Sequence, residues 1–253
     1  MVSGAEREAV RADGPLAGQT VVVVGGSAGI GLETARQVRA AGGELVLVAR
    51  NAERLERAAR ELGPLSTAAF DAQDAERLET FLRELPGRVD HVLVTAGSPL
   101  YTPLAKVDLS EAARDFGGRV AVMLAVARAG REKVRPGGTL LFVGGTGGRR
   151  PAPGMAVMGA VTAALPALTA NLALETAPVR VNLIAAGFVD TPLSAALLGD
   201  RLDERREQLR RTLPIGRVVG PADVAALAVH LMVNDALTGA TYDIDGGQQL
   251  VHD

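Results

Sequence analysis

A glycine-rich turn between a run of valines and a helix-like segment is the first feature of this chain with chemical potential. Gly25-Gly-Ser-Ala-Gly-Ile-Gly31 follows directly on VVVV and opens the helix-like segment. Glycines permit a tight turn and let backbone N–H groups approach a pyrophosphate, which a helix N-terminus then stabilises electrostatically. Placed between a strand and a helix, the pattern predicts a dinucleotide-binding loop, whereas a plain structural turn is the alternative interpretation.

The end of the second apolar run indicates which dinucleotide is bound. This run ends Val48-Ala49-Arg50-Asn51. An acidic residue at this place would accept a hydrogen bond from a ribose 2′-hydroxyl, which Ala49 cannot do, while the Arg50 guanidinium can pair with a 2′-phosphate. The sequence therefore predicts NADP(H) in preference to NAD(H). The alternative interpretation is a solvent-exposed arginine at the beginning of a helix.

The remaining composition argues against several other kinds of chemistry. There is no cysteine, so thiolate catalysis, disulfides and sulfur-ligated metals are excluded. The three histidines, His91, His230 and His252, are far apart and have no spaced carboxylate partner, so no metal site is expected. Lys+Arg 27 against Asp+Glu 29 gives a net charge of -2, which provides no basic surface for nucleic acid.

Short apolar runs alternate with helix-like segments along almost the whole chain. Runs that are apolar on both faces and are separated by helices are typical of a parallel sheet covered on two sides. The sequence therefore predicts an α/β fold, a Rossmann-type doubly wound sheet of about seven mainly parallel strands flanked by helices on both faces. The expected strands are Val21–Val24, Leu45–Val48, Thr67–Phe70, Val92–Val94, Leu140–Val143, Val181–Ala185 and Thr241–Ile244, and the expected helices are Gly31–Ala41, Glu53–Leu62, Ala75–Leu85, Glu111–Val134, Met155–Thr176 and Ala222–Val233.

The chain is expected to form one domain over residues 18–253, preceded by a flexible polar arm over residues 1–17 that has no secretory apolar core. Leu193–Thr212 is charged and helix-prone and lies between a strand and the last helix, where an inserted polar flap is typical of a lid over a substrate. Pro151–Leu174 carries no charge, but it is rich in Ala, Gly and Thr, so we expect a buried helix there and no membrane span.

The order of these landmarks resembles the short-chain dehydrogenase/reductase family over essentially the full length. The glycine turn is similar to that family's TGxxxGxG, with Val24 in place of Thr, and Asp71 stands where the family places an acid against the adenine. Thr95-Ala-Gly97 resembles a degenerate NNAG, and Val179–Asn182 with Ala186–Thr191 resembles the VRVN…PGxVxT segment that holds the nicotinamide. The resemblance implies a cofactor site formed by Gly25, Ser27, Ala28, Gly29, Ile30, Gly31, Arg50, Asn51, Asp71, Ala72, Thr95, Ala96, Gly97, Thr162, Gly187, Val189 and Thr191.

The catalytic residues that the family resemblance leads one to expect are missing. In that family a Ser, a Tyr and a Lys act with an Asn, and the Lys lowers the Tyr pKa so that the phenol exchanges the proton that accompanies hydride transfer. Aligned without a gap, these positions hold Gly145 for the Ser, Met158 for the Tyr, Thr162 for the Lys and Arg119 for the Asn. The sequence therefore resembles an atypical member of the family.

Three other side chains are candidates to take over parts of the missing chemistry. Arg119 would stabilise a developing oxyanion or bind a substrate carboxylate. Thr146, next to Gly145, carries a hydroxyl, and Tyr101 is the phenol expected near the cleft, although packing on its loop is the simpler interpretation. Losing a general acid costs roughly 10²–10⁴ in rate, so turnover need not disappear with it.

Three functions remain open from the sequence. The first is an NADP(H)-dependent oxidoreductase with a non-standard active site that acts on a small carbonyl or alcohol substrate. The second is a catalytically inactive NADP(H)-binding sensor or scaffold, and the third is a non-redox isomerase or cyclase on the same fold. The expected partner is a small molecule, with no nucleic acid and no membrane, in a cytoplasmic protein. The resemblance implies a homo-tetramer or homo-dimer formed through the helices near Ala112–Val134 and Met155–Thr176.

Overall fold

Each expected apolar run forms a strand of one seven-stranded sheet in the computed structural model, which describes residues 14–251. The strand order is β3-β2-β1-β4-β5-β6-β7, and every neighbouring pair is parallel. The order reverses between β1 and β4, and in open parallel sheets ligands bind at the carboxyl ends of the strands at such a switch point. The strands are β1 Thr20–Val24, β2 Glu44–Ala49, β3 Ser66–Ala69, β4 Val89–Val94, β5 Val134–Gly145, β6 Arg180–Ala186 and β7 Thr241–Ile244.

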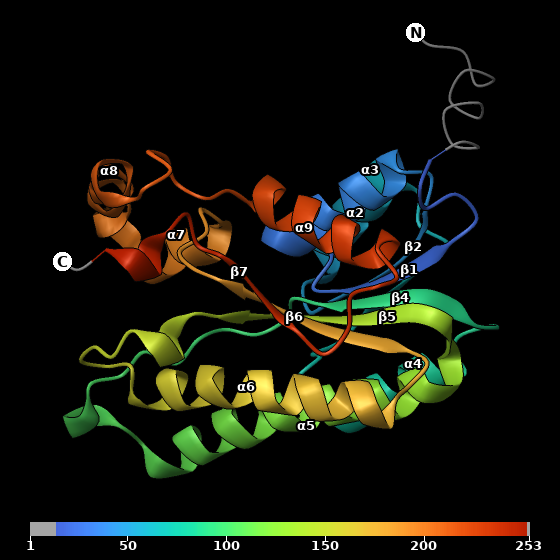
Figure 1. The fold of residues 1–253 in the computed structure, drawn as a ribbon, viewed down its shortest axis with the longest axis horizontal. Helices are drawn as coiled ribbons and strands as arrows, with labels where there is room; N and C mark the ends of the chain where they lie inside the picture. The colour runs from blue at the N-terminus through green and yellow to red at the C-terminus, as the bar shows by residue number, and fades with distance from the viewer. Residues whose placement is uncertain (1–13, 252–253) are drawn as a thin grey trace, which may run out of the picture.

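Two layers of helices cover the sheet, one on each face (Figure 1). Strand β1 illustrates why both layers are needed: Val21 and Val23 face one apolar core, while Val22 and Val24 face the other. Burying a valine side chain contributes roughly 1.5–3 kcal/mol, so this strand is stabilised from both sides. Helices α2 Gly29–Ala40, α3 Ala52–Leu62 and α9 Pro221–Val233 lie over one face, and α4 Ala75–Glu84, α5 Leu109–Lys133 and α6 Ala156–Glu175 over the other. The doubly wound fold class is therefore confirmed.

The chain is already packed before β1, so part of the expected N-terminal arm belongs to the domain. Leu16 is fully buried, and its N–H donates to the Ala41 carbonyl at 3.0 Å. The prediction of a flexible arm is therefore wrong for residues 14–17, because Leu16 packs in the core with residues of β1 and α2. Residues 1–13 of the expected arm lie outside the described part of the chain.

The segment expected to be a lid is helical throughout. Helix α7 (Pro192–Leu198) and helix α8 (Leu202–Thr212) are joined by a single 3₁₀ turn over Gly199–Arg201. In Figure 1 both helices lie at the end of the sheet where the parallel strands finish, beside the C-terminal end of the chain.

Helix α6 has the length and apolar composition of a membrane span. About a third of its most apolar window is buried, and it lies beside α5 with its inner side on the sheet. Val161, Leu165 and Leu172 on that inner side are buried in the core. A core helix can have the same composition as a membrane span, and packing against the sheet explains the apolar residues on the inner side of α6.

Candidate functional site

The glycine turn after β1 has almost no room for side chains. A Cβ on Gly31 would lie 2.2 Å from the Gly25 carbonyl oxygen and 2.7 Å from Thr95 Oγ1. Gly25 also has a φ of +99°, a conformation that side chains other than glycine rarely adopt. Strand β4 closes this packing, because Thr95 Oγ1 donates to the Val24 carbonyl at 3.2 Å. The turn is held against β2 as well, because the Gly25 N–H donates to the Val48 carbonyl at 2.8 Å.

The N-terminus of α2 has no side-chain cap, in contrast to those of α3, α4 and α5. Asn51, Asp74 and Asp108 each accept a hydrogen bond from a backbone N–H of the helix that follows. At α2 the N-cap residue is Ala28, and no acidic residue lies in the first turn. The free N–H groups and the partial positive charge of the helix dipole therefore remain available to an anion. Together with the crowded glycine turn, this arrangement fits the pyrophosphate of a dinucleotide.

The residues expected around the adenosine lie at the exposed rim beyond β2 and β3. Arg50 and Asp71 form an ion pair with 3.8 Å between Nη1 and Oδ2, and both side chains are more than half exposed. The Asn51 side chain is occupied as the cap of α3, accepting from the Arg54 N–H at 2.7 Å. Ala72, in contrast, is buried in the core. The Arg50 guanidinium is thus exposed at the rim, with only a loose contact to a carboxylate.

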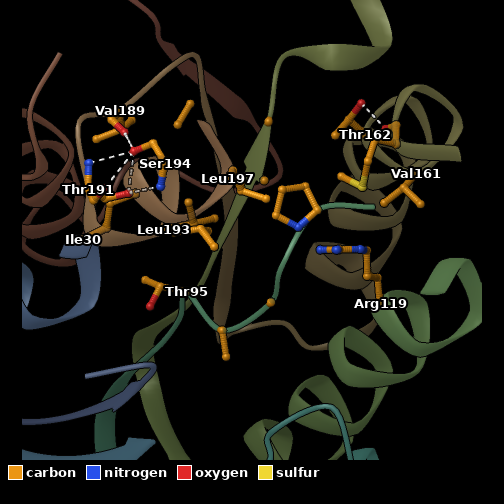
Figure 2. Close-up of a pocket in the computed structure, with 18 of the residues that line it drawn as sticks. Ile30, Thr95, Arg119, Val161, Thr162, Val189, Thr191, Leu193, Ser194 and Leu197 are labelled. Atoms are coloured by element: carbon orange, nitrogen blue, oxygen red, sulfur yellow. Dashed lines mark hydrogen bonds between the residues drawn. The ribbon is translucent and has the colours of Figure 1, made fainter. Parts of the chain in front are cut away.

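A cavity of about 660 Å³ opens beside the glycine turn, at the carboxyl ends of β1, β4, β5 and β6. In Figure 2, Ile30, Thr95 and Thr191 stand on one side of this cavity and Arg119, Val161 and Thr162 on the other, with Leu193 and Leu197 of the lid between them. The expected cofactor residues that line it are Ile30, Thr95, Ala96, Gly97, Thr162, Gly187, Val189 and Thr191. Ser27, Ala28 and Gly29 instead line a neighbouring hollow between α2 and α3.

The helix α6 side of the cavity carries methionine and threonine where the family resemblance leads one to expect Tyr and Lys. Met158 and Thr162 both line the cavity and are each 7% exposed. The Thr162 hydroxyl donates back to the Met158 carbonyl at 2.7 Å, and so caps a carbonyl of its own helix. Gly145, opposite, leaves space that a Cβ would enter with only ordinary contact, 3.5 Å from Thr162 Cγ2. This wall offers no group that exchanges a proton at neutral pH.

Arg119 and Tyr101 also line the cavity, with Arg119 on the same side as Val161 and Thr162 in Figure 2, while Thr146 does not line it. Arg119 Nη2 donates to the Ser98 carbonyl at 2.5 Å, and its Nε and Nη2 each lie 3.2 Å from an oxygen of Asp115. Tyr101 is 52% exposed, and the partial burial of its phenol raises the pKa, an effect that the charge of Arg119 partly offsets. The phenol therefore stays protonated at neutral pH but is a weak acid. Thr146 is buried, and its N–H continues the pairing of β5 with β6 by donating to Ala186.

The segment after β6 is held from two directions. From the C-terminal side, the Gln248 side chain accepts a hydrogen bond from the Phe188 N–H at 2.9 Å. From the lid side, the Ser194 hydroxyl donates to the Val189 carbonyl at 2.6 Å, and Ser194 and Thr191 form a reciprocal cap at the start of α7 (Figure 2). The backbone of this cavity wall is consequently fixed by Ser194, five residues away in sequence, and by Gln248, 60 residues away.

Two residues in the VRVN-like stretch have structural roles, whereas the family motif suggested contact with a nicotinamide. Buried Arg180 donates to backbone carbonyls at the C-terminal end of α9, including Leu231 at 2.8 Å and Met232 at 2.8 Å. Fully buried Asn182 donates to the Leu237 carbonyl at 2.8 Å. Neither residue lines the cavity.

An ion pair that the sequence did not predict joins α8 to the cavity wall. Arg206 of α8 donates from Nε to Asp190 Oδ2 at 2.9 Å and from Nη2 to Oδ1 at 2.8 Å. The charged pattern of Leu193–Thr212 indicated an exposed helix but gave no sign that one arginine of several would reach Asp190. Within residues 14–251, no group of three His, Asp or Glu side chains is arranged to hold a metal ion.

The chain is similar to known proteins in sequence and in fold. The family model described as enoyl-(acyl carrier protein) reductase matches residues 24–249. The short-chain dehydrogenase/reductase ATR9 of Stachybotrys chlorohalonatus is 30% identical over 253 residues, which cover 91% of this chain and 96% of the relative. The structure of the MalC reductase/Diels–Alderase from Malbranchea aurantiaca superposes with a TM-score of 0.86 at 25% identity, over 94% of this chain and 98% of that one. A small-chain dehydrogenase in complex with NADPH superposes with a TM-score of 0.78 at 27% identity, over 92% of this chain and 99% of that one. This chain belongs to the short-chain dehydrogenase/reductase family.

Proposed function

We propose that the protein is an NADP(H)-dependent oxidoreductase that acts on a small carbonyl compound, and that its preferred substrate is one whose carbonyl is conjugated to a carbon–carbon double bond. The observation that carries the proposal is that Arg119 lines a cavity in which Gly145, Met158 and Thr162 occupy the positions of the missing Ser, Tyr and Lys. The cavity can stabilise negative charge but has no strong proton donor.

The cofactor half of the proposal is supported by the uncapped N-terminus of α2, the crowded glycine turn and the exposed Arg50. The α2 N–H groups would bind the pyrophosphate, and Arg50 would bind the 2′-phosphate once it leaves Asp71. A reduced nicotinamide, when bound, supplies a hydride equivalent to the substrate. The family membership and the NADPH complex of one structural relative support this class of cofactor.

The substrate preference follows from what Arg119 can and cannot do. A saturated ketone that accepts a hydride equivalent becomes an alkoxide, a strong base that requires a proton at once. A conjugated ketone that accepts it at the β-carbon becomes an enolate, whose charge is delocalised and whose α-carbon can take its proton later from water. Arg119 would hold the enolate oxygen by a charge-assisted hydrogen bond, and as an arginine it would keep its own proton. The family model's description as an enoyl reductase supports the same substrate class.

NADPH oxidation with cyclohex-2-enone and with cyclohexanone tests the proposal. We expect oxidation with the enone and little with the saturated ketone, and the Arg119→Ala variant should lose about 10²-fold in enone turnover. Arg128→Ala is the matched control, since Arg128 lies exposed on the same helix and does not line the cavity. Failure of both ketones to consume NADPH, or an unchanged Arg119→Ala variant, would overturn it.

A non-redox cyclisation or isomerisation is the second candidate. It is favoured by the likeness to a protein named both as a reductase and as a Diels–Alderase, and by a cavity lined mainly by apolar side chains, such as Phe142, Leu165 and Leu197. Product formation without net change in NADPH would establish this function. NADPH binding without turnover of any substrate would instead favour the sensor.

A homo-dimer or homo-tetramer formed through α5 and α6 is part of the proposal. Phe116 and Leu124 on α5 and Leu174 on α6 are large apolar side chains that are exposed in the single chain, with Leu174 80% exposed. Burying such side chains is what obligate interfaces do. A monomeric sedimentation coefficient at micromolar concentration would count against it.

A further inference from the structure

The cavity has an uneven charge composition. Within the described part of the chain, three arginines line it, namely Arg119, Arg201 and Arg205, and no aspartate or glutamate does. Arg119 already has a counter-ion, because Asp115 lies 3.2 Å from two of its nitrogens. The two lid arginines are therefore the cationic groups of the cavity that call for an explanation.

Arg201, which precedes α8, and Arg205 on α8 differ from the other arginines of this helix in their partners. Arg206, Arg210 and Arg211 each pair with an aspartate or glutamate. Among residues 14–251, neither Arg201 nor Arg205 forms such an ion pair, and the hydrogen bond of Arg205 is to the neutral Gln208 side chain at 2.7 Å. The carboxylates that form ion pairs on this helix do so with its other arginines and not with Arg201 or Arg205.

Arg205 also lies on the inward side of its helix. It precedes Leu209 by four residues, which places both on one face, and Leu209 is 2% exposed. A guanidinium that is partly withdrawn from water costs free energy unless an anion or several hydrogen bonds compensate. One neutral hydrogen bond compensates little, so the position of Arg205 is best explained by an anion that arrives with a ligand.

The cavity that Arg201 and Arg205 line also has a large apolar part. Leu193, Leu197, Phe188, Met158 and Val161 all line this space. A ligand that satisfies both regions has an anionic end at the lid and an apolar chain that reaches toward the floor.

We propose that Arg201 and Arg205 bind the carboxylate of an amphipathic substrate whose apolar chain lies along the leucines of the lid. The inference deepens the proposed function, on which it rests only in that the same cavity holds the substrate. It makes Arg201 and Arg205 specificity-determining residues, separate from Arg119 at the reacting end.

Calorimetric titration of the full-length protein with octanoate and with octanamide, each with and without saturating NADPH, tests this inference. The two probes have the same chain and differ in the charge of the head group. Octanoate should bind at least about tenfold more tightly than octanamide, because a hydrogen bond to a charged group is worth that factor or more. The Arg201→Gln/Arg205→Gln double variant should lose this difference and keep its NADPH affinity. Arg210→Gln is the matched control, because Arg210 is exposed on the same helix and does not line the cavity.

Three results would overturn the inference. Equal affinities for the two probes would remove the need for a carboxylate site, and a difference that survives in the double variant would move the site elsewhere. Loss of NADPH affinity in the double variant would assign the arginines to the cofactor phosphates. If the unaltered protein binds no NADPH, the proposed function fails, while the octanoate preference measured without NADPH still decides this inference.

Discussion

Arg206 and Asp190 join the lid to the cavity wall through two parallel hydrogen bonds, of 2.9 and 2.8 Å. Asp190 is itself fixed, because its N–H donates to the Val219 carbonyl at 3.0 Å. Its neighbours Val189 and Thr191 both line the cavity. Movement of helix α8 is therefore coupled mechanically to the backbone that faces the substrate.

Breaking this pair should loosen the lid without unfolding the domain. In the Arg206→Ala variant we expect residues 192–212 to be cut several-fold faster by trypsin at their remaining arginines, while the Tm changes little because both partners are partly exposed. Arg211→Ala is the control, since its contact with Glu207 is a loose 3.8 Å. Equal cleavage rates in the two variants would show that the pair does not hold the lid.

Alanine substitutions of two glycines, one in the crowded glycine turn and one in an open helix position, should change the stability in opposite directions. Gly31→Ala should destabilise the protein by about 1–3 kcal/mol and abolish dinucleotide binding, because its Cβ would collide with the Gly25 carbonyl. Gly117→Ala, within helix α5, should stabilise by about 0.5–1 kcal/mol, because nothing lies within 4 Å of the added Cβ. Denaturant melts and NADPH titrations of both variants check this prediction, which a folded, binding-competent Gly31→Ala protein would contradict.

Arg50 should determine the choice between the two dinucleotides. Arg50→Ala is expected to weaken NADPH binding by about 10- to 100-fold and to leave NADH binding nearly unchanged, since only NADPH carries the 2′-phosphate. Fluorescence titration with each nucleotide measures both affinities. A parallel loss for NADH would mean that Arg50 supports the fold of the rim rather than the phosphate.

The missing proton donor should be restorable. Gly145→Ser/Met158→Tyr/Thr162→Lys places the three family side chains on the wall that now lacks them, and the space at Gly145 accepts a Cβ. Cyclohexanone reduction should rise by about 10²–10⁴-fold over the unaltered protein, the usual contribution of a general acid. The Gly145→Ser single variant is the control and should gain little. An inactive but folded triple variant that still binds NADPH would indicate that the helix α6 register differs from the family's.

His91 makes a prediction about pH and stability. Burial, together with the charge of Arg180, lowers its pKa from 6.5 to about 3, and its Nε2 lies 2.7 Å from Gln19 Oε1. Between pH 6.5 and 3 the unfolded chain binds a proton at this histidine that the folded protein does not bind, so the free energy of unfolding falls as the pH falls. The contribution reaches about 1.4 kcal/mol per pH unit. His91→Gln should flatten this slope, and urea melts at pH 7 and pH 5 measure it; an unchanged slope would mean that His91 titrates normally.

The strands were predictable because their pattern is local. Four consecutive valines can hardly be buried except between two helical layers, and the structure places them there. Leu16 was not predictable, since a single leucine in a polar stretch gives no periodic signal and its burial depends on the Ala41 carbonyl at the end of α2.

In the candidate site too, features set by local sequence were predictable, and features that depend on distant residues were not. The glycine turn was predictable from the spacing of its own glycines. The role of Arg180 was not predictable, because it depends on carbonyls of Leu231, Asn234 and Leu237, more than 50 residues away. No property of the VRVN-like stretch distinguishes an arginine that faces a cofactor from one that binds the end of a helix. The prediction that the Thr146 hydroxyl takes part in the site is not supported, because Thr146 does not line the cavity although its neighbour Gly145 does.

The hydrogen bond between Gln248 and Phe188 has a consequence for the nascent protein. Its two partners are separated by 60 residues, and the neighbouring Gly187 N–H donates to Ile244, also from the far end of the chain. During synthesis, the glycine turn and Arg50 can fold on the ribosome while this wall still lacks its support. The segment after β6 can therefore reach its final conformation only after β7 and Gln248 have been synthesised.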